Sequence, residues 1–195
     1  LHLLIIMKFS SEEIKDIIKA WLAISIAFAI ILGKESVFSH LFFMNFLIAA
    51  ITVGLGFLLH ELAHKKVAQY YGCFAEFRAF NFMLVLAIIF SFFGFVFAAP
   101  GAVFISGQVT KSRNGKISIA GPATNILLAL IFLILAQIDL GSFINLITNY
   151  GHTINSWLAV FNLIPILGLD GSKVLAWNKP IYFVSAIISL SLLFL

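Results

Sequence analysis

Long apolar runs, separated by short polar loops, make up most of the sequence. Five runs are long enough to enter or cross a hydrocarbon core of roughly 30 Å, and they cover residues 17–32, 41–59, 82–99, 119–138 and 152–167. A sixth run, residues 181–195, would extend only roughly 22 Å as a helix, at about 1.5 Å per residue. The pattern predicts an all-α polytopic membrane protein with about five to six transmembrane helices.

Two shorter signals lie outside these runs. Ser10-Ser11-Glu12-Glu13 has the pattern of a capping box, which predicts a helix that begins there and continues into the first run. Residues 102–110 and 116–119 favour strands and flank Ser112-Arg113-Asn114-Gly115. Because an Asn-Gly pair between such segments is typical of a tight turn, we expect a small β-hairpin there.

The composition agrees with a membrane protein. Of the 195 residues, 62% are hydrophobic and 10% charged, which is too little polar surface to wrap a soluble core of this size. We expect a single integral-membrane domain over residues 1–195. The single cysteine, Cys73, excludes an internal disulfide and fits a reducing, cytosolic face. Residues 1–6 carry no Lys or Arg, and we expect translation to start at Met7.

The segment His60-Glu61-Leu62-Ala63-His64 directly extends the second apolar run. Residues four apart share one face of a helix, so the two imidazoles would be stacked, with Glu61 beside them. This is the arrangement of zinc hydrolases, in which the metal lowers the pKa of a bound water to roughly 7 and a carboxylate takes its proton. An ionisable side chain costs about 2.5 kcal/mol or more at mid-membrane depth, so such residues normally pair or bind something. The motif therefore predicts a metal site rather than a solvated helix face.

A catalytic zinc site needs a third protein ligand, and Asp170 is the best-placed candidate. It follows the fifth run, in a segment where Pro165 and Gly168 would break a helix. Non-helical backbone at membrane depth is tolerated where it lines a cavity, so a carboxylate there is placed for coordination. The alternative is a plain Asp-Gly turn that ends a helix. His152 would lie roughly 27 Å from Asp170 along a continuous helix, so we expect it at the membrane interface instead.

A third motif accompanies the histidine motif and the segment that contains Asp170. The motifs are His60-Glu61-Leu62-Ala63-His64, Asn162-x-x-Pro165-x-x-x-Leu169-Asp170-Gly171 and Ala120-Gly121-Pro122-Ala123-Thr124-Asn125. Together they resemble the site-2 protease family of intramembrane zinc metalloproteases, over a catalytic core of about residues 41–173. The resemblance implies one Zn²⁺ per chain, held by His60, His64 and Asp170, with Glu61 as the catalytic base.

The same resemblance implies a role for two asparagines and a substrate class. Asn162 would donate to the developing oxyanion, unless its amide only packs helices, and Asn125 is expected to serve packing. The implied activity is that of a zinc metalloendopeptidase in the lipid bilayer, which hydrolyses peptide bonds of membrane-spanning protein substrates near the cytosolic face in regulated intramembrane proteolysis. A helical substrate must unwind locally, and the strand expected at residues 102–110 could pair with it along one edge. The alternative is a strand with a structural role only.

One metal shared by the ends of the second and fifth runs requires both ends on one side of the membrane. Residues 82–99 can then not cross once, and we expect a re-entrant segment or a tight hairpin. This topology places eleven Lys and Arg residues on one side and Lys34 alone on the other. The positive-inside rule therefore predicts a multi-pass protein of the cell membrane whose active site faces the cytosol. Because the basic residues lie in short loops, the formal charge of +4 implies no nucleic-acid partner.

A different class of function uses the same residue types. Buried His and Asp residues also mark ion pathways, so the alternative is a membrane metal-ion transporter or sensor. Such a protein would not need the Glu61 base. A catalytically dead scaffold is a third alternative, but the complete set of Glu61, two histidines and Asp170 argues against it.

Overall fold

The structure is a computed structural model that describes residues 7–33, 39–96, 100–166 and 168–195. The elements are α1 (Ser11–Leu32), α2 (His40–Ala49), the π-helical turn η1 (Ala50–Gly54), α3 (Leu55–Tyr70), β1 (Phe74–Ala79), α4 (Asn81–Ser91), β2 (Gly101–Ser106), α5 (Lys111–Ala136), α6 (Ser142–Leu163), α7 (Asp170–Trp177) and α8 (Lys179–Leu192). The fold is therefore mainly helical, with a small antiparallel sheet. The predicted translation start, which concerns residues 1–6, and Lys34 lie outside the described residues.

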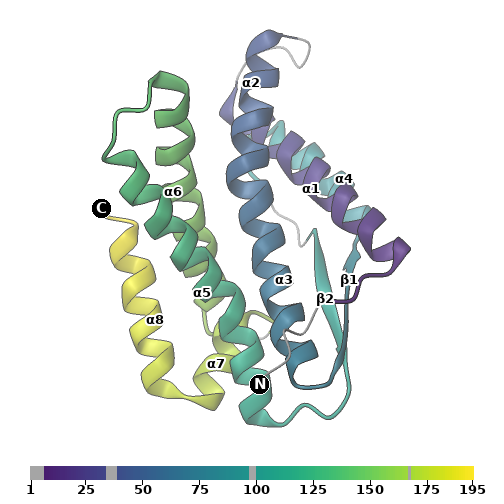
Figure 1. Cartoon of the computed structure of the whole chain (residues 1–195). Coiled ribbons are helices and arrows are strands. Elements are labelled where there is room, and N and C mark those ends of the chain that lie inside the picture. The colour runs from purple at the N-terminus through teal and green to yellow at the C-terminus, as the bar shows by residue number, and fades with distance from the viewer. Residues whose placement is uncertain (1–6, 34–38, 97–99, 167) are drawn as a thin grey trace.

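One long helix separates two groups of elements (Figure 1). α2, η1 and α3 follow one another without a break and run along the molecule. On one side, α5 packs against both α3 and α6, and α8 packs against α6. On the other side, α1 lies against α2 and α4 and against the sheet. α7 is a short helix at one end, between α5 and α8.

Two helical stretches are long and apolar enough to cross a membrane. They are His40–Tyr70, which comprises α2, η1 and α3, and Lys111–Ala136, which is α5. α4 and α8 are apolar but shorter. By length and composition the described residues thus support association with a membrane, and the predicted five to six transmembrane helices are not confirmed.

The N-terminal helix begins where the sequence predicts. The Ser10 side chain accepts a hydrogen bond from the amide of Glu13 and caps α1. Glu13 does not return the bond to Ser10, because its carboxylate is buried and forms an ion pair with the equally buried Lys65 of α3. Its other oxygen accepts from the amide of Phe77 in β1, at 2.9 Å. A buried charge needs such partners, and this one ties α1 to α3 and to the sheet.

The two strands pair antiparallel, with Phe77 opposite Val103 and Ala79 opposite Gly101. α4 and the connection after it therefore leave and rejoin the same end of the sheet. This geometry agrees with the prediction that residues 82–99 return to the side from which they start. How this segment lies in a membrane stays a prediction.

The hairpin predicted over residues 102–119 is wrong. β2 exists, but its partner is β1, and the chain from Lys111 onward is the first part of α5. The side chain of Thr110 caps this helix by accepting from the amide of Arg113. Gly115 lies inside the helix, where a Cβ would collide with the Trp177 side chain of α7. The glycine therefore permits close packing of α5 on α7 and does not form a turn.

Candidate metal centre

The break that the sequence predicts after the fifth run is present. α6 ends at Leu163, and Gly168 adopts a φ of 101°, a conformation that favours glycine. Asp170 is then the first residue of α7. At Gly171 a Cβ would collide with the carbonyl of Leu163, so the start of α7 lies directly against the end of α6. This contact fixes the position of the neighbouring Asp170.

The three predicted ligands meet in the structure. His60 and His64 lie one turn apart on α3, with their rings 4.7 Å apart between centroids and nearly perpendicular. The Nε2 atoms of His60 and His64 lie 3.2 Å and 3.1 Å from Oδ2 of Asp170. All three residues are buried, at 8% exposure or less. Residues more than a hundred positions apart in the chain thus form one polar cluster in an apolar interior.

The spacing of these atoms fits a zinc ion. Ligands at about 2.0 Å from a tetrahedral ion lie about 3.3 Å from one another, close to the two separations seen here. Two imidazole nitrogens and one carboxylate oxygen are also a donor set that zinc takes at catalytic sites, where the fourth position stays open. The residues present therefore fit this metal.

The protonation of the cluster follows from its neighbours. Burial alone would raise the pKa of Asp170, but the hydrogen bonds from His60 and His64 outweigh burial and hold that pKa below its usual range. Asp170 is therefore a carboxylate at neutral pH, the form that binds a cation.

The opposite nitrogen of each imidazole is bound as well. Nδ1 of His64 lies 2.8 Å from the carbonyl oxygen of Ile117 on α5. A carbonyl only accepts, so Nδ1 carries a hydrogen, and Nε2 offers its lone pair to a metal once it has given up the hydrogen that it shares with Asp170. Nδ1 of His60 lies 2.5 Å from Oδ1 of Asn125, also on α5. α5 therefore holds both rings from the side away from Asp170.

The third sequence motif explains how α5 comes so close. A Cβ at Gly121 would collide with Nε2 of both histidines, so only glycine allows this approach. Pro122 lies inside α5 and lacks an N–H, which disturbs the regular bonding of the preceding helical turn. The carbonyl that loses its helical partner is that of Ser118, next to Ile117.

Glu61 lies at the edge of the cluster. One ligand atom from each of His60, Glu61 and His64 lies within 4.8 Å of the others, so these three residues could hold a metal ion. The Glu61 carboxylate accepts a hydrogen bond of 3.1 Å from the amide of Val103 in β2. The predicted base is thus placed between the metal ligands and the sheet.

Comparison with known proteins gives the family. The chain is 42% identical over 191 residues to a protein of Methanocaldococcus jannaschii named "Putative zinc metalloprotease MJ0611", and the match covers 96% of this chain and 94% of that protein. This chain belongs to that zinc metalloprotease family. A second protein from the same organism, "Zinc metalloprotease MJ0392", is 28% identical over 153 residues, which cover 77% of this chain but 39% of that protein.

The other two comparisons add no further description of the family. No family model matches this chain. No solved structure matches it either.

Asn162 and His152, which the sequence analysis also considered, form hydrogen bonds away from the metal ligands. The amide nitrogen of Asn162 donates to the carbonyl of Leu158 in its own helix, at 2.9 Å. Its predicted contact with an oxyanion stays a prediction. His152 is buried in the middle of α6, with Nδ1 3.0 Å from the carbonyl of Ala129, rather than at the end of a span. It is a core histidine shared by α5 and α6.

The sequence reasoning missed the residues behind the ligands. Asn125 is fully buried and contacts His60, where a packing role was predicted. The contact of His64 is a backbone carbonyl, which no sequence motif specifies. Gly121 and Pro122, shortly before Asn125, could have indicated these contacts, since both residues mark a close approach of α5 to another element.

Proposed function

We propose that this protein is an intramembrane zinc metalloendopeptidase of the site-2 protease type, with a membrane-spanning protein as its substrate. The convergence of His60, His64 and Asp170 in a mainly apolar helical chain is the observation that carries the proposal. The names of both relatives agree with a zinc-dependent peptide hydrolase.

In this mechanism His60, His64 and Asp170 hold one zinc ion. The ion, when bound, would polarise the scissile carbonyl and lower the pKa of the attacking water. Glu61 takes the proton of that water and returns it to the leaving amine. Glu61 is suited to this task because it adjoins His60 in the chain and its carboxylate already lies beside the ligand atoms.

Asn162 is proposed to assist as a donor to the oxyanion. After its bond to the Leu158 carbonyl, its amide nitrogen retains a second hydrogen. Asn162 directly precedes Leu163, whose carbonyl abuts Gly171 beside Asp170. Asn162 is thus one residue from the end of α6 that abuts the start of α7, where Asp170 lies, and the second hydrogen is proposed to serve a bound substrate.

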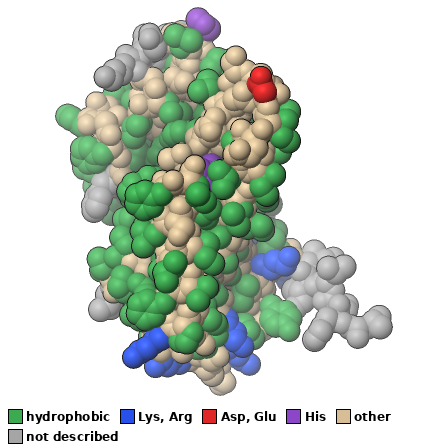
Figure 2. All heavy atoms as spheres, turned by 90° about the vertical axis from the view of Figure 1, so that its left-hand side faces the viewer, with side chains coloured by type: hydrophobic (Ala, Val, Ile, Leu, Met, Phe, Trp, Pro, Cys, Tyr) green, Lys and Arg blue, Asp and Glu red, His purple; other side chains and the backbone are tan. Residues whose placement is uncertain are grey.

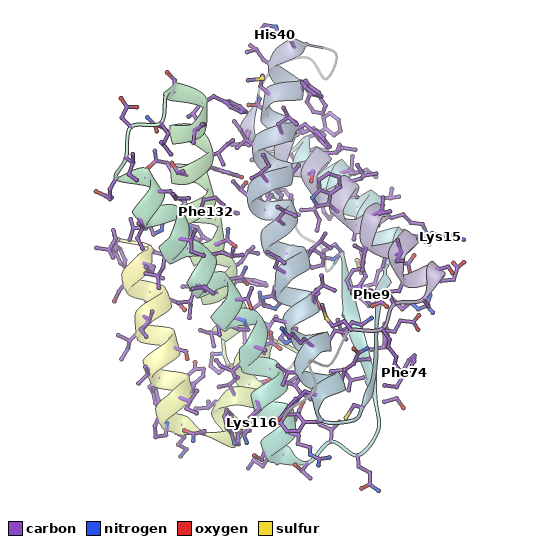
Figure 3. All side chains as sticks on the ribbon, viewed as in Figure 1. Phe9, Lys15, His40, Phe74, Lys116 and Phe132 are labelled. Atoms are coloured by element: carbon purple, nitrogen blue, oxygen red, sulfur yellow. The ribbon has the colours of Figure 1, made fainter. Side chains whose placement is uncertain are left out.

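The proposed topology keeps five to six spans and an active site toward the cytosol. Lys and Arg side chains gather at one end of the face that Figure 2 shows, the end at which Figure 3 labels Lys116, with His40 at the opposite end. Lys116 directly precedes Ile117, which binds His64, and Nζ of Lys173 lies 3.8 Å from Oδ1 of Asp170. The metal centre thus lies toward the basic end, which the positive-inside rule assigns to the cytosol.

The outer edge of β2 is proposed to bind the unwound substrate. Strand residues alternate between bonding the partner strand and facing away from it. The amides of Phe77 and Ala79 on β1 bond to Glu13 and Asp16 of α1, so α1 covers that edge. On β2 the outward amide of Val103 reaches Glu61, which places this edge beside the proposed base.

Replacing Ile105 by proline tests the edge. By the same alternation the Ile105 amide faces outward, and proline would remove this donor without touching the bond to Glu61. One lost hydrogen bond is worth about 0.5–1.5 kcal/mol, so kcat/KM for a membrane-spanning substrate should fall about two- to tenfold through KM, with zinc retained. Ile105→Ala is the control for the side chain. An unchanged KM for Ile105→Pro would leave β2 with a structural role only.

The function itself is tested with the purified protein in vesicles that contain a membrane-spanning substrate and a zinc indicator. We expect defined cleavage products that depend on zinc and stop with a chelator, and no zinc transport. Zinc flux across the vesicle membrane without any product from a panel of substrates would favour the metal-ion transporter instead.

A further inference from the structure

The metal centre is backed by a chain of buried amides that crosses three helices. Asn125 on α5 and Asn155 on α6 are both fully buried. The amide nitrogen of Asn155 donates to the carbonyl of Gly151, at 2.9 Å. The amide nitrogen of Asn125 donates to the carbonyl of Gly56 on α3, at 3.1 Å, and to Oδ1 of Asn155, at 3.0 Å.

Two backbone carbonyls fix the direction of this chain. A carbonyl oxygen only accepts, so Gly151 requires that Asn155 turn its nitrogen toward it and its oxygen toward Asn125. Gly56 requires in the same way that Asn125 present its nitrogen to α3. Both hydrogens of the Asn125 nitrogen are then used, and its Oδ1 is the atom that faces His60.

His60 has one way to satisfy this contact. Oδ1 of Asn125 accepts, so Nδ1 of His60 must carry the hydrogen that lies between them, 2.5 Å from atom to atom. In a neutral imidazole Nε2 is then the atom with the lone pair. Nε2 is also the atom that faces Asp170.

We infer that Asn125 is a positioning residue of the metal centre, which holds His60 in the form that offers Nε2 to zinc. This inference rests on the proposed metal site. The role differs from packing because it depends on an acceptor atom at Oδ1 rather than on the volume of the side chain. His64 receives the same constraint from the Ile117 carbonyl, so Asn125 is the one of the two partners that a substitution can remove.

Zinc affinity of three variants, measured by competition with a chromophoric chelator, tests the inference. Asn125→Leu keeps the approximate volume but removes the acceptor, and should weaken zinc binding about 10- to 100-fold. Asn125→Asp keeps an acceptor at Oδ1 and should bind zinc within about threefold of wild type. Among the described residues, the neighbouring Thr124 side chain bonds to the Ala120 carbonyl of its own helix, so Thr124→Val serves as the matched control and should bind as wild type does.

The two Asn125 variants separate positioning from packing. If the residue served packing alone, Asp would be the more harmful change, because it loses two donors and buries a charge. Equal or greater loss of zinc with Asp than with Leu, or wild-type affinity with Leu, would therefore overturn the inference.

A second readout does not need the metal. Nitrogen-15 NMR of histidines in the metal-free protein at alkaline pH should show His60 with its hydrogen on Nδ1, and a mixture of both forms in Asn125→Leu. Hydrogen on Nε2 of His60 in the wild type would overturn the inference even if zinc binds. If the wild type binds no zinc, the proposed metal site fails, and the NMR result still decides whether Asn125 controls this ring.

Discussion

Replacing Glu61 by glutamine should abolish peptide hydrolysis while zinc stays bound at its wild-type level. General base catalysis contributes about 10²- to 10⁴-fold, and glutamine keeps the shape of the side chain but cannot take a proton. The loss should appear in kcat rather than in KM, because the substrate would still bind. Cleavage of a membrane-spanning substrate, followed by mass spectrometry of the products, measures the effect beside the zinc content of the same sample.

The control for Glu61→Gln is Glu12→Gln, which removes the same charge at an exposed position of α1. It should cleave as the wild type does. If Glu61→Gln retained more than about a tenth of the wild-type rate, Glu61 would not be the base.

Replacing Asp170 by alanine should release the metal. This change removes one of three proposed ligands and leaves two buried imidazoles without their carboxylate partner. Zinc affinity should fall by more than the roughly 10- to 100-fold that is typical of changes behind the ligands, and activity should fall with it. The measurement is chelator competition, with circular dichroism to show that the helices remain.

Asp139→Ala provides the control for the loss of an acidic side chain, because the Asp139 carboxylate accepts from Gly141 and Asn145 at the exposed start of α6. It should bind zinc normally. Normal zinc binding by Asp170→Ala would instead support the Asp-Gly turn that the sequence leaves as the alternative.

Polar residues explain where the predicted elements and the structure differ. The fifth apolar run predicts a span from residue 152, whereas α6 begins at Ser142. Its first turns contain Asn145, Thr148 and Asn149, which lower the apolar character of the window but satisfy their side chains within or near the helix. A hydropathy window counts these groups as polar and cannot register that each has a partner.

The ligands could be predicted because their chemistry is local, and the residues behind them could not. His60, Glu61 and His64 share one helical turn, and the break around Gly168 marks Asp170. The contact from Asn125 depends on how α5 packs against α3, which spacing along the chain does not encode. The same holds for β2, whose partner strand lies before α4 rather than after the Asn-Gly pair.

Zinc K-edge X-ray absorption of the purified Glu61→Gln protein tests the central claim most directly. Two imidazoles, one carboxylate and one water predict four nitrogen or oxygen neighbours at about 2.0–2.2 Å, with the scattering pattern of two histidines. A sulfur neighbour at about 2.3 Å, or a spectrum without imidazole scattering, would contradict a zinc site formed by His60, His64 and Asp170.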